Sequence, residues 1–407
     1  MALPGEPYRS FVLPDPSFHV VGVSHHTASL VERERFALSP ADTTAFLAHQ
    51  HSLGKPSLLL STCNRCELYW SGDDDLEPWF TQLPQAGAGR SDLPTARHDG
   101  EAAVRHLFSV VAGLDSQILG ETEILGQVRR AYDMARAAGT TTREMDLILS
   151  AALSAGRRVR AETMLGRHPA SVSSAAVDLV IERGGGFAPD EVLVLGAGEA
   201  AEGVLRALQD RGATGVTLLS RHPARTRVLA EAWGARVGDW GELDDRLETA
   251  RSLFVATAAS RPLVSASQLS RGTAQTTGRQ LWVVDLAVPR NVEPSARALP
   301  GLQLFDLDDL QRLCCPAAGA PSVALAEAER VINEELLRLG THLRGHSAAP
   351  KLAELHRCGV EIAEQESAWA LAQLDGLSES DREIVRQMAD RLVRRVLYPV
   401  SRNLRSE

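Results

Sequence analysis

Apolar residues in the first part of the chain follow two different periods. Three short apolar runs bounded by turn residues predict strands at residues 20–23, 57–62 and 67–70. Ser39-Pro40 predicts a helix start, because serine caps a helix N-terminus and proline fits the first turn. From about residue 100 to residue 165 the apolar residues recur at helical spacing, with few Gly or Pro interruptions, which predicts three mostly helical segments. Residues 1–165 are therefore expected to form an α+β domain, with a loop-like stretch at 71–95.

The middle of the chain alternates apolar strands with helical segments. The predicted strands cover residues 191–195, 215–219, 252–257 and 281–285. Strands that alternate with helices are typical of a parallel sheet covered on both faces. Residues 166–312 are expected to form a doubly wound, Rossmann-like domain.

The last segment has the spacing of amphipathic helices. Its first apolar stripe consists of Leu325, Ala328, Ile332, Leu336, Leu339 and Leu343. Ser380 and Glu383 predict a capping box ahead of a second stripe that starts at Ile384. Long amphipathic helices with little to bury them locally usually pair with another chain. Residues 321–407 are therefore expected to form an all-α dimerisation domain.

Length and charge narrow the class of protein. A chain of 407 residues is too long for one ordinary core, so several domains are expected. A net charge of −9 argues against generic binding to DNA, although it allows a structured RNA partner. Five cysteines without framework spacing are typical of a reducing compartment. Because no segment has the apolar length of a membrane span and the N-terminus lacks a secretion signal, we expect a cytoplasmic protein without a membrane partner.

Cys63 is the first candidate for chemistry. It ends an apolar run and is followed by Asn64 and Arg65, at the polar end where side chains meet solvent and ligands. A cation beside a thiol raises its thiolate fraction, and Arg65 is positioned in the sequence to supply one or to bind a substrate carboxylate. The alternative is a small apolar residue at a strand end. We favour a reactive thiol.

Cys63 and Cys66 also form a C-x-x-C pair. A redox dithiol of this kind usually opens a helix, whereas the residues that follow predict a strand. A structural zinc site needs four ligands, and the remaining cysteines offer no second pair at suitable spacing. We expect no metal, and redox cycling only as a secondary role.

Residues 113–127 interrupt a helical pattern with glycines and polar side chains. Glu123 and Gln127 are four residues apart and share a helix face, with Ser116 just before them. Such a stripe is either plain surface or a place where ligand or backbone approaches closely, and glycines amid apolar residues favour the second. His106 stands among apolar residues, where a histidine is more often a satisfied core residue than an acid or base.

A nucleotide-binding turn follows the strand at 191–195. Gly196 permits the tight turn, Gly198 lets the backbone approach a pyrophosphate, and Ala201 lets the helix pack closely on the strand. The next strand ends in Ser220-Arg221, where an NAD enzyme usually carries an acidic residue. An arginine there suits the extra phosphate of NADP. The alternative is a domain of this fold that has lost its nucleotide.

Together these segments resemble the glutamyl-tRNA reductase family over nearly the whole chain and in order. The resemblance rests on residues 22–26, 61–65, 113–127, 196–201 and 285–290, and the T-C-N-R and G-E-x-x-I-L-G-Q segments are its most specific parts. It implies a V-shaped protein in which catalytic and NADPH-binding domains are joined along a long helix to a dimerisation domain. It also implies NADPH-dependent conversion of tRNA-bound glutamate to glutamate 1-semialdehyde, the first committed step of five-carbon tetrapyrrole synthesis.

The resemblance assigns roles residue by residue. Cys63 matches the nucleophile that forms a glutamyl thioester, and His106 matches a histidine important for activity. The substrate-binding positions matched are Thr62, Cys63, Asn64, Arg65, Ser116, Glu121, Thr122, Glu123 and Gln127. The cofactor-binding positions, inferred from the nucleotide-binding turn and the end of the next strand, are Gly196, Ala197, Gly198, Glu199, Ala200, Ala201, Ser220 and Arg221. The implied partners are glutamyl-tRNA and a second copy of the chain, and the aminomutase that uses the semialdehyde is a candidate third.

Three departures from the family pattern stand near the predicted site. Cys66 replaces a Thr or Ser, Glu123 replaces a Gln, and Ala201 replaces a Gly. Two other functions compete with the reductase. A dehydrogenase of the shikimate type would have a similar nucleotide domain but no use for residues 62–65. A regulatory paralogue that binds tRNA or haem without turnover would not need Cys63, Arg65 and the glycine turn together.

Overall fold

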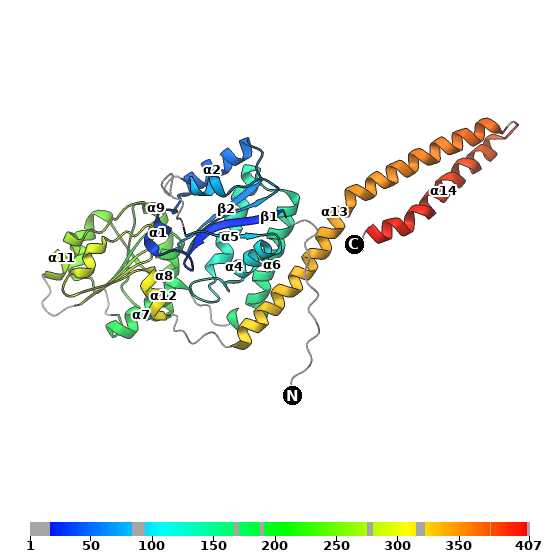
Figure 1. Ribbon diagram of the computed structural model, residues 1–407. Helices are drawn as coiled ribbons and strands as arrows, with labels where there is room; N and C mark the ends of the chain where they lie inside the picture. Colours follow the sequence, from blue (N-terminus) through cyan, green and yellow to red (C-terminus); the bar gives the residue numbers. More distant parts are fainter. Residues whose placement is uncertain are drawn as a thin grey trace. The chain divides into compact units, whose positions relative to one another are not determined.

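The computed structural model describes residues 17–83, 94–166, 171–187, 191–274, 280–314, 322–374 and 376–404. The chain divides into two compact units, one from residue 17 to residue 332 and one from residue 333 onward. Figure 1 gives the labels of the elements. Among the described residues, no helix is both long and apolar enough to cross a membrane.

The larger unit begins with a four-stranded antiparallel sheet. Its strand order is β2-β3-β1-β4, with β1 (Phe18–Ser24), β2 (Ser57–Ser61), β3 (Arg65–Ser71) and β4 (Ala96–Asp99). Between these strands lie α1 (Leu30–Glu34), α2 (Pro40–Ser52) and α3 (Glu77–Thr81). The helix start predicted at Ser39-Pro40 is confirmed, because Ser39 and Asp42 form a capping box there. The stretch 71–95 is not entirely loop, since α3 lies within it; its residues 84–93 lie outside the described part.

Three helices pack on this sheet, as the pattern from residue 100 predicts. They are α4 (Glu101–Ala112), α5 (Glu123–Ala138) and α6 (Arg143–Glu162), followed by a short 3₁₀ turn, η1 (Met164–Gly166). Gly156 of α6 allows close approach to α4, because a side chain there would press against Val111. The expected α+β architecture is confirmed.

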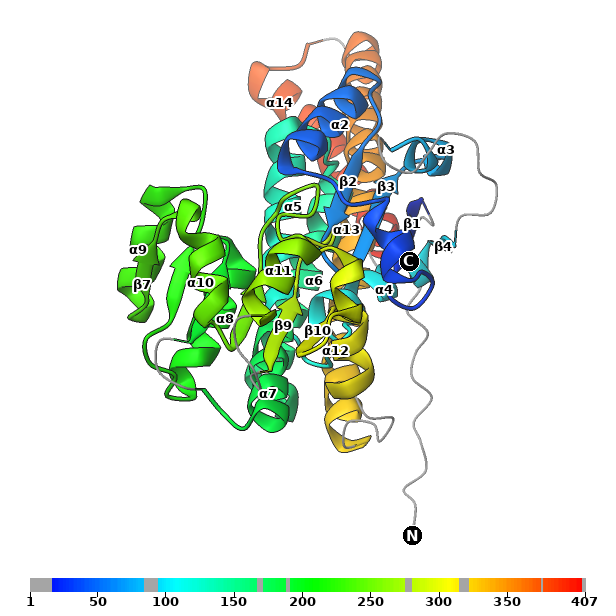
Figure 2. The ribbon, with the colours of Figure 1, turned by 90° about the vertical axis from the view of Figure 1, so that its left-hand side faces the viewer.

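A six-stranded parallel sheet forms the second part of this unit. The strand order is β10-β9-β8-β5-β6-β7. Counted along the chain this is the order 3-2-1-4-5-6 of a dinucleotide-binding fold, so the expected Rossmann-like domain is confirmed. The strands are β5 (Val192–Leu195), β6 (Thr217–Leu219), β7 (Arg236–Gly238), β8 (Ser252–Val255), β9 (Leu281–Asp285) and β10 (Leu302–Phe305). The edge strand β7 lies with α9 at the outer end of the domain (Figure 2).

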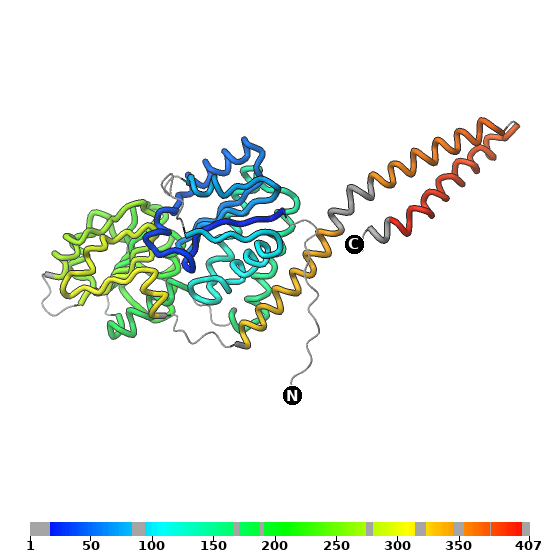
Figure 3. Tube along the Cα trace, in the orientation of Figure 1, coloured from blue at the N-terminus to red at the C-terminus, as the bar shows by residue number. Residues whose placement is uncertain are grey.

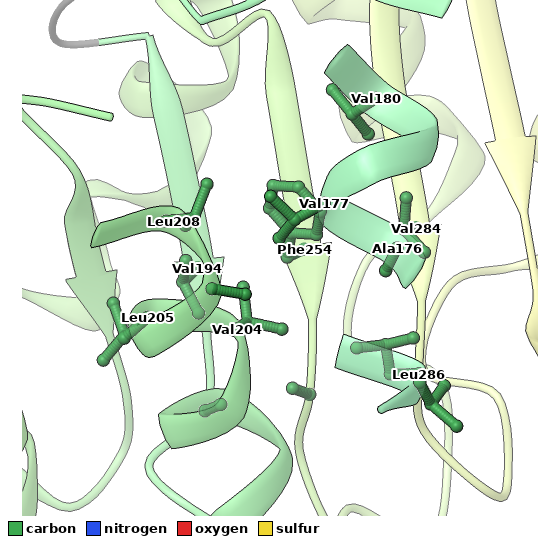
Figure 4. Packing of buried hydrophobic residues seen from close by; sticks show 14 of the residues in the cluster. Ala176, Val177, Val180, Val194, Val204, Leu205, Leu208, Phe254, Val284 and Leu286 are labelled. Carbon is green, nitrogen blue, oxygen red and sulfur yellow. The ribbon is translucent and has the colours of Figure 1, made fainter. Parts of the chain in front are cut away.

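Helices cover both faces of the parallel sheet. They are α7 (Val172–Gly184), α8 (Glu199–Asp210), α9 (Pro223–Trp233), α10 (Leu243–Thr249), α11 (Ala266–Ala274) and α12 (Leu307–Cys314), with 3₁₀ turns η2 (Trp240–Glu242) and η3 (Pro294–Ala298). Figure 4 shows Val177 of α7 and Val204 of α8 packed toward Val194, Phe254 and Val284 of adjacent strands. All five are completely buried, and each contributes roughly 1.5–3 kcal/mol by leaving water.

Charged contacts connect the two parts of the larger unit through α1. Nη2 of Arg33 lies 2.9 Å from Oδ1 of Asp308 on α12. The guanidinium of Arg290, which follows β9, donates to both carboxylate oxygens of Glu34 at 2.8 and 2.9 Å. These side chains are largely withdrawn from solvent, so the ion pairs are less screened than surface pairs.

The second unit contains two long helices, α13 (Ser322–Gln373), which begins in the larger unit, and α14 (Glu379–Leu404). The two run antiparallel in Figure 3, and at Gly359 of α13 an added side chain would press on Val393 and Leu397 of α14. The predicted capping box at Ser380 is wrong. Ser378 caps α14 together with Asp381, because the helix begins at Glu379 and already includes Ser380.

Candidate active site

Residues 62–65 form the turn between β2 and β3. The N–H of Thr62 donates to the carbonyl of Arg65 at 2.8 Å, which closes the turn. Oγ1 of Thr62 accepts from the backbone N–H groups of Asn64 and Arg65, both at 3.2 Å. The carbonyl of Asn64 accepts from the N–H of His25 at 3.0 Å, which ties the turn to the end of β1. Cys63 is therefore held by a turn whose backbone and hydroxyl groups are bonded to one another.

The two cysteines of the C-x-x-C pair belong to different apolar cores. Cys63 is partly buried and packs against an apolar cluster that joins Leu30 and Ile118 of the catalytic domain to the core of the nucleotide-binding domain. Cys66 lies in β3, opposite Val23 and Ser61, and is buried in the core of the N-terminal sheet. Both are free thiols in the described part of the chain. Because β3 starts at Arg65, the extended backbone directs Cys66 away from the tip of the turn.

The environment of Cys63 favours the neutral thiol. Burial raises its pKa to about 12, and the carboxylates of Glu121 and Glu123 act in the same direction. The cation that opposes them is Arg33. The sequence left open whether Arg65 supplies such a cation or binds a substrate carboxylate; in the structure its guanidinium pairs with Glu67 and Asp115.

Arg65 is the centre of a buried ionic network. Its Nη1 lies 2.7 Å from Oε1 of Glu67 and 2.9 Å from Oδ2 of Asp115, and its Nη2 donates to the carbonyl of Asp115. Arg65 and Glu67 are 2% and 3% exposed, so this charge pair is screened little by water. Burial alone would raise the pKa of Glu67, but Arg65 and His106 lower it to about 2.

His106 belongs to the same network. Its Nε2 lies 3.0 Å from Oε1 of Glu67, and its ring stacks on His98 with 4.9 Å between centroids. Burial lowers the pKa of His106, but Glu67 outweighs it and the net shift is upward. The structure therefore connects His106 to the turn through Glu67 and Arg65.

The segment 113–127 places two acidic residues near the thiol. Glu121 is 3% exposed, and burial followed by the charge of Glu123 raises its pKa to about 7, while a hydrogen bond from Ser116 opposes the rise. Glu123 is the first residue of α5, after Thr122 at the N-cap position. Its Oε1 is buried and has no partner among the described residues.

Glu123 also approaches the nucleotide-binding domain. A side chain added at Gly203 of α8 would lie 3.1 Å from Oε1 of Glu123. Burial and the nearby Glu199 raise the pKa of Glu123. Gln127 lies one turn further along α5 and is half-buried.

A pocket of about 200 Å³ surrounds the glycine-rich turn. Gly196 has φ +124°, and a side chain there would collide with the carbonyl of Ala256, so only glycine fits. Gly198 is the N-cap of α8, which directs backbone N–H groups toward the pocket. The pocket is lined by Gly196, Ala197, Gly198, Ser220, Arg221, His222, Arg225, Trp240, Thr257, Ala258 and Leu263.

The remaining predicted cofactor residues lie on α8 beside this pocket. Ala201 is completely buried, which allows the helix to lie close to the sheet. Glu199 forms an ion pair with Arg130 of α5, and the carbonyl of Ala200 accepts from Ser173 Oγ at 3.3 Å. These residues fit a dinucleotide, because the glycine turn supplies N–H groups for a pyrophosphate and two arginines line the pocket, Arg221 after β6 and Arg225 on α9.

Sequence reasoning missed several residues of these sites. His222 and Arg225 line the nucleotide pocket, and the spacing of Arg225 four residues after Arg221 was the available signal. Glu67 was detectable as a charged residue within an apolar strand. Arg33 carried no such signal, because its contacts come from α12, which is distant in sequence. Asp285 was included in the segment 285–290, but its structural role was not predicted: it closes the loop after β9 by accepting the backbone N–H groups of Asn291 at 2.7 Å and Val292 at 2.8 Å.

Comparison with known proteins identifies the family. The chain is 36% identical to the glutamyl-tRNA reductase of Pelotomaculum thermopropionicum over 95% of its length and 89% of the relative. It is 38% identical to that of Deinococcus radiodurans over 79% of its length and 92% of the relative. The chain belongs to the glutamyl-tRNA reductase family. It is an oxidoreductase with the three-domain architecture of that family.

Three successive parts of this glutamyl-tRNA reductase family member each match a known domain family. Residues 21–163 match the glutamyl-tRNA reductase N-terminal domain, 178–313 match shikimate/quinate 5-dehydrogenase, and 327–407 match the glutamyl-tRNA reductase dimerisation domain. A solved glutamyl-tRNA reductase from Methanopyrus kandleri is 28% identical and has a TM-score of 0.46, covering 96% of this chain and 98% of that one.

Proposed function

We propose that this enzyme reduces glutamate esterified to tRNA to glutamate 1-semialdehyde, with NADPH as reductant and Cys63 as nucleophile, at the first step of five-carbon tetrapyrrole synthesis. The main support is the position of Cys63. It stands in a hydrogen-bonded turn of the catalytic domain and packs against an apolar cluster in which Leu30 and Ile118 of that domain meet the core of the nucleotide-binding domain. An acyl group on this sulfur would therefore lie between the two domains.

The proposed reaction has two steps at the sulfur of Cys63. The thiolate attacks the ester carbonyl, the ester bond breaks, and the tRNA hydroxyl leaves with a proton. The resulting thioester accepts a hydride at its carbonyl carbon, and the thiolate then departs to give the aldehyde. NADPH, when bound, supplies this hydride.

Two carboxylates suggest how the thiol is activated. Glu121 and Glu123 raise the pKa of Cys63 in the free protein. The α-ammonium group of a glutamyl ester is a cation that would pair with such carboxylates. Its arrival would offset the charges that oppose the thiolate, so that activation accompanies substrate binding. Ser116, Thr122 and Gln127 are proposed to line the same substrate site.

The turn residues are assigned supporting roles. Thr62 holds the turn through its hydroxyl, and Asn64 offers a buried Oδ1 that has no partner among the described residues. Arg65 is proposed as a substrate ligand, but a carboxylate would reach it only by displacing Asp115 from its Nη1. His106 is proposed to position this network through Glu67.

Cofactor choice is proposed to depend on the end of β6. Arg221 and Arg225 line the pocket where the ribose of a dinucleotide bound at the glycine turn would lie. Two guanidinium groups favour the 2′-phosphate of NADPH over the hydroxyl of NADH. The other proposed cofactor contacts are made by residues 196–201 and Ser220.

The proposed assembly is a homodimer in the cytoplasm that takes glutamyl-tRNA as substrate. Support comes from α14, where Ile384, Met388, Leu392 and Val396 are each more than half exposed at four-residue spacing. These positions share one helix face, which is suited to a second chain. The aminomutase that uses the semialdehyde remains a proposed third partner.

The test is NADPH oxidation by the full-length chain with charged glutamyl-tRNA. We expect oxidation that requires the ester and fails with uncharged tRNA. The second candidate, a shikimate-type dehydrogenase, is favoured only by the match of residues 178–313. Oxidation of shikimate with NADP, without any dependence on tRNA, would replace the proposal with that activity. Binding of tRNA without turnover of either substrate would indicate a regulatory paralogue.

A further inference from the structure

A second pocket, with a volume of about 330 Å³, lies at the end of β1 and has no role in the reaction described above. One wall consists of residues 25–29 and Arg33. The other consists of Asp308, Gln311 and Arg312 of α12. The pocket is therefore formed jointly by the catalytic and nucleotide-binding parts of the larger unit.

Arg33 is the buried cation of this pocket, with 4% of the residue exposed. Its Nη1 donates to the carbonyl of Ala28 and its Nη2 to Oδ1 of Asp308, both at 2.9 Å. Its Nε is buried and has no hydrogen-bond partner among the described residues. A buried cationic N–H without an acceptor is unfavourable, so a ligand oxygen at this atom would satisfy it.

His25 provides a second unsatisfied nitrogen in the same wall. Its Nδ1 is buried and lacks a partner in the described part of the chain. Burial lowers the pKa of His25 to about 3, so the ring is neutral at physiological pH. In the tautomer with the proton on Nδ1, this atom is a donor. The pocket thus contains two unused nitrogen positions suited to binding oxygen.

The pocket is adjacent to the reactive turn. The backbone N–H of His25 donates to the carbonyl of Asn64, the residue after Cys63, at 3.0 Å. Arg33 is also the cation whose charge acts on the Cys63 thiol. A group bound in this pocket would therefore lie close to the acyl group transferred to Cys63.

The charges around the pocket indicate the class of ligand. Asp308 faces it, but both of its oxygens are engaged, Oδ1 by Arg33 and Oδ2 by the N–H of Leu30 at 3.0 Å. Arg312 is mostly exposed and forms an ion pair with Asp309. Among the described residues, Nε of Arg33 and Nδ1 of His25 are the buried side-chain atoms of this pocket that lack a partner. An oxyanion is the ligand that a guanidinium N–H binds most strongly.

We propose that this pocket is a subsite for an oxyanion of the substrate, held by Nε of Arg33 and Nδ1 of His25. The inference rests on the proposed function. An aminoacyl ester of tRNA carries two kinds of group with this chemistry, the side-chain carboxylate of the glutamyl group and the phosphodiester of the terminal nucleotide. Both are carried close to the ester that Cys63 attacks.

The test compares Arg33→Gln with the wild-type full-length enzyme on three esters. These are glutamyl-tRNA, glutamyl-adenosine, which lacks phosphate, and glutaminyl-tRNA, which lacks the side-chain carboxylate. The measured quantity is kcat/KM for ester cleavage. Loss of a hydrogen bond to a charged group predicts a decrease of about tenfold to a hundredfold with glutamyl-tRNA. His25→Ala should lower the same quantity by a smaller factor, and it replaces Arg33→Gln if that variant does not fold.

The pattern across the esters identifies the ligand. A decrease with glutamyl-tRNA but not with glutamyl-adenosine assigns the pocket to the phosphate. A decrease with both glutamyl esters but not with glutaminyl-tRNA assigns it to the carboxylate. An equal decrease with all three, or no decrease with any, overturns the subsite while wild-type cleavage of glutamyl-tRNA upholds the proposed function. A wild-type enzyme that cleaves none of the esters refutes both.

Asp308→Asn is the matched control for the contact between Arg33 and α12. It removes the charge partner of Arg33 but leaves the guanidinium in place. Because it also removes a carboxylate that faces the bound anion, it should lower KM for glutamyl-tRNA, opposite to Arg33→Gln. If Asp308→Asn instead reproduces the decrease in kcat/KM, Arg33 acts through its contact with α12 and the subsite is refuted.

Discussion

Replacing Glu67 with Gln should destabilise the catalytic domain more than its small change in size suggests. The carboxylate accepts from Nη1 of Arg65 at 2.7 Å and from the hydroxyl of Tyr69 at 2.6 Å, and it contacts Nε2 of His106 at 3.0 Å. A glutamine has the same shape but no charge, and its NH₂ group would face other donors. Arg65 would keep Asp115 as its remaining charged partner.

The magnitude follows from these contacts. Removing one partner of a buried ion pair costs about 3–5 kcal/mol, and hydrogen bonds to charged groups contribute about 1.5–3 kcal/mol. Because Asp115 remains, we expect a loss of about 2–4 kcal/mol. For a domain of this size, that corresponds to a decrease in Tm of roughly 5–15 °C. Tyr69→Phe removes one hydrogen bond to the carboxylate but keeps its charge, and should cost about 1.5–3 kcal/mol.

The assay is calorimetry of the full-length chain across pH. Because the pKa of Glu67 is lowered from its ordinary value of 4.5 to about 2, its stabilisation is complete above 4.5 and is lost as the pH falls through about 2. The difference in Tm between wild type and Glu67→Gln should therefore be largest near neutral pH and narrow below pH 4.5. An equal difference at pH 7 and pH 3, or none at pH 7, would refute the charged network.

The same variant should lower the pKa of His106, since Glu67 is what raises it. The stabilisation from the raised pKa is complete below 6.5 and is lost as the pH rises through the folded value. NMR titration of the imidazole gives the direct measurement. A pKa of His106 that is unchanged in Glu67→Gln would show that the contact at 3.0 Å does not hold in solution.

Three further predictions concern single sites. Arg221→Ala should raise KM for NADPH about tenfold or more with little effect on NADH, and Arg225→Ala should act in the same direction; equal losses with both cofactors would assign these residues to the fold. Glu123→Gln should lower the pKa of Cys63, measured as the pH dependence of alkylation by iodoacetamide, and an unchanged profile would remove Glu123 from the surroundings of the thiol. Peroxide should inactivate wild type and Cys66→Ser at the same rate, because Cys66 lies in a separate core; protection by Cys66→Ser would instead reveal a disulfide switch.

The order of strands and helices was predictable because the spacing of apolar residues along the chain indicates which side chains are buried. Short apolar runs in the sequence predict the strands at 57–61 and 192–195, and apolar residues at helical spacing predict the helices after residue 100. Both patterns can be recognised from neighbouring residues alone. Helix starts were harder, as α14 shows, where Ser378 and Ser380 each precede an acidic residue by three positions. Only the fold selects Ser378, because nothing local distinguishes the two caps.

The candidate site was predictable only in part. The turn at 62–65 and the glycine turn at 196 are local signals. The pairing of Arg65 with Asp115, and the approach of Arg33 to Cys63, depend on residues far apart in sequence. In the sequence, Arg65 is the cation closest to the Cys63 thiol. In the fold, the charge of Arg33 acts on Cys63, and the guanidinium of Arg65 is buried in contacts with Glu67 and Asp115.

The most direct test of the central claim is detection of the acyl-enzyme. The full-length enzyme is incubated with tRNA charged with labelled glutamate, without NADPH, then quenched in acid and mapped by mass spectrometry. Label on Cys63 in wild type and in Cys66→Ser, with none in Cys63→Ser, is the predicted result. Label on another residue, or semialdehyde formation by Cys63→Ser at a near-normal rate, would contradict the account.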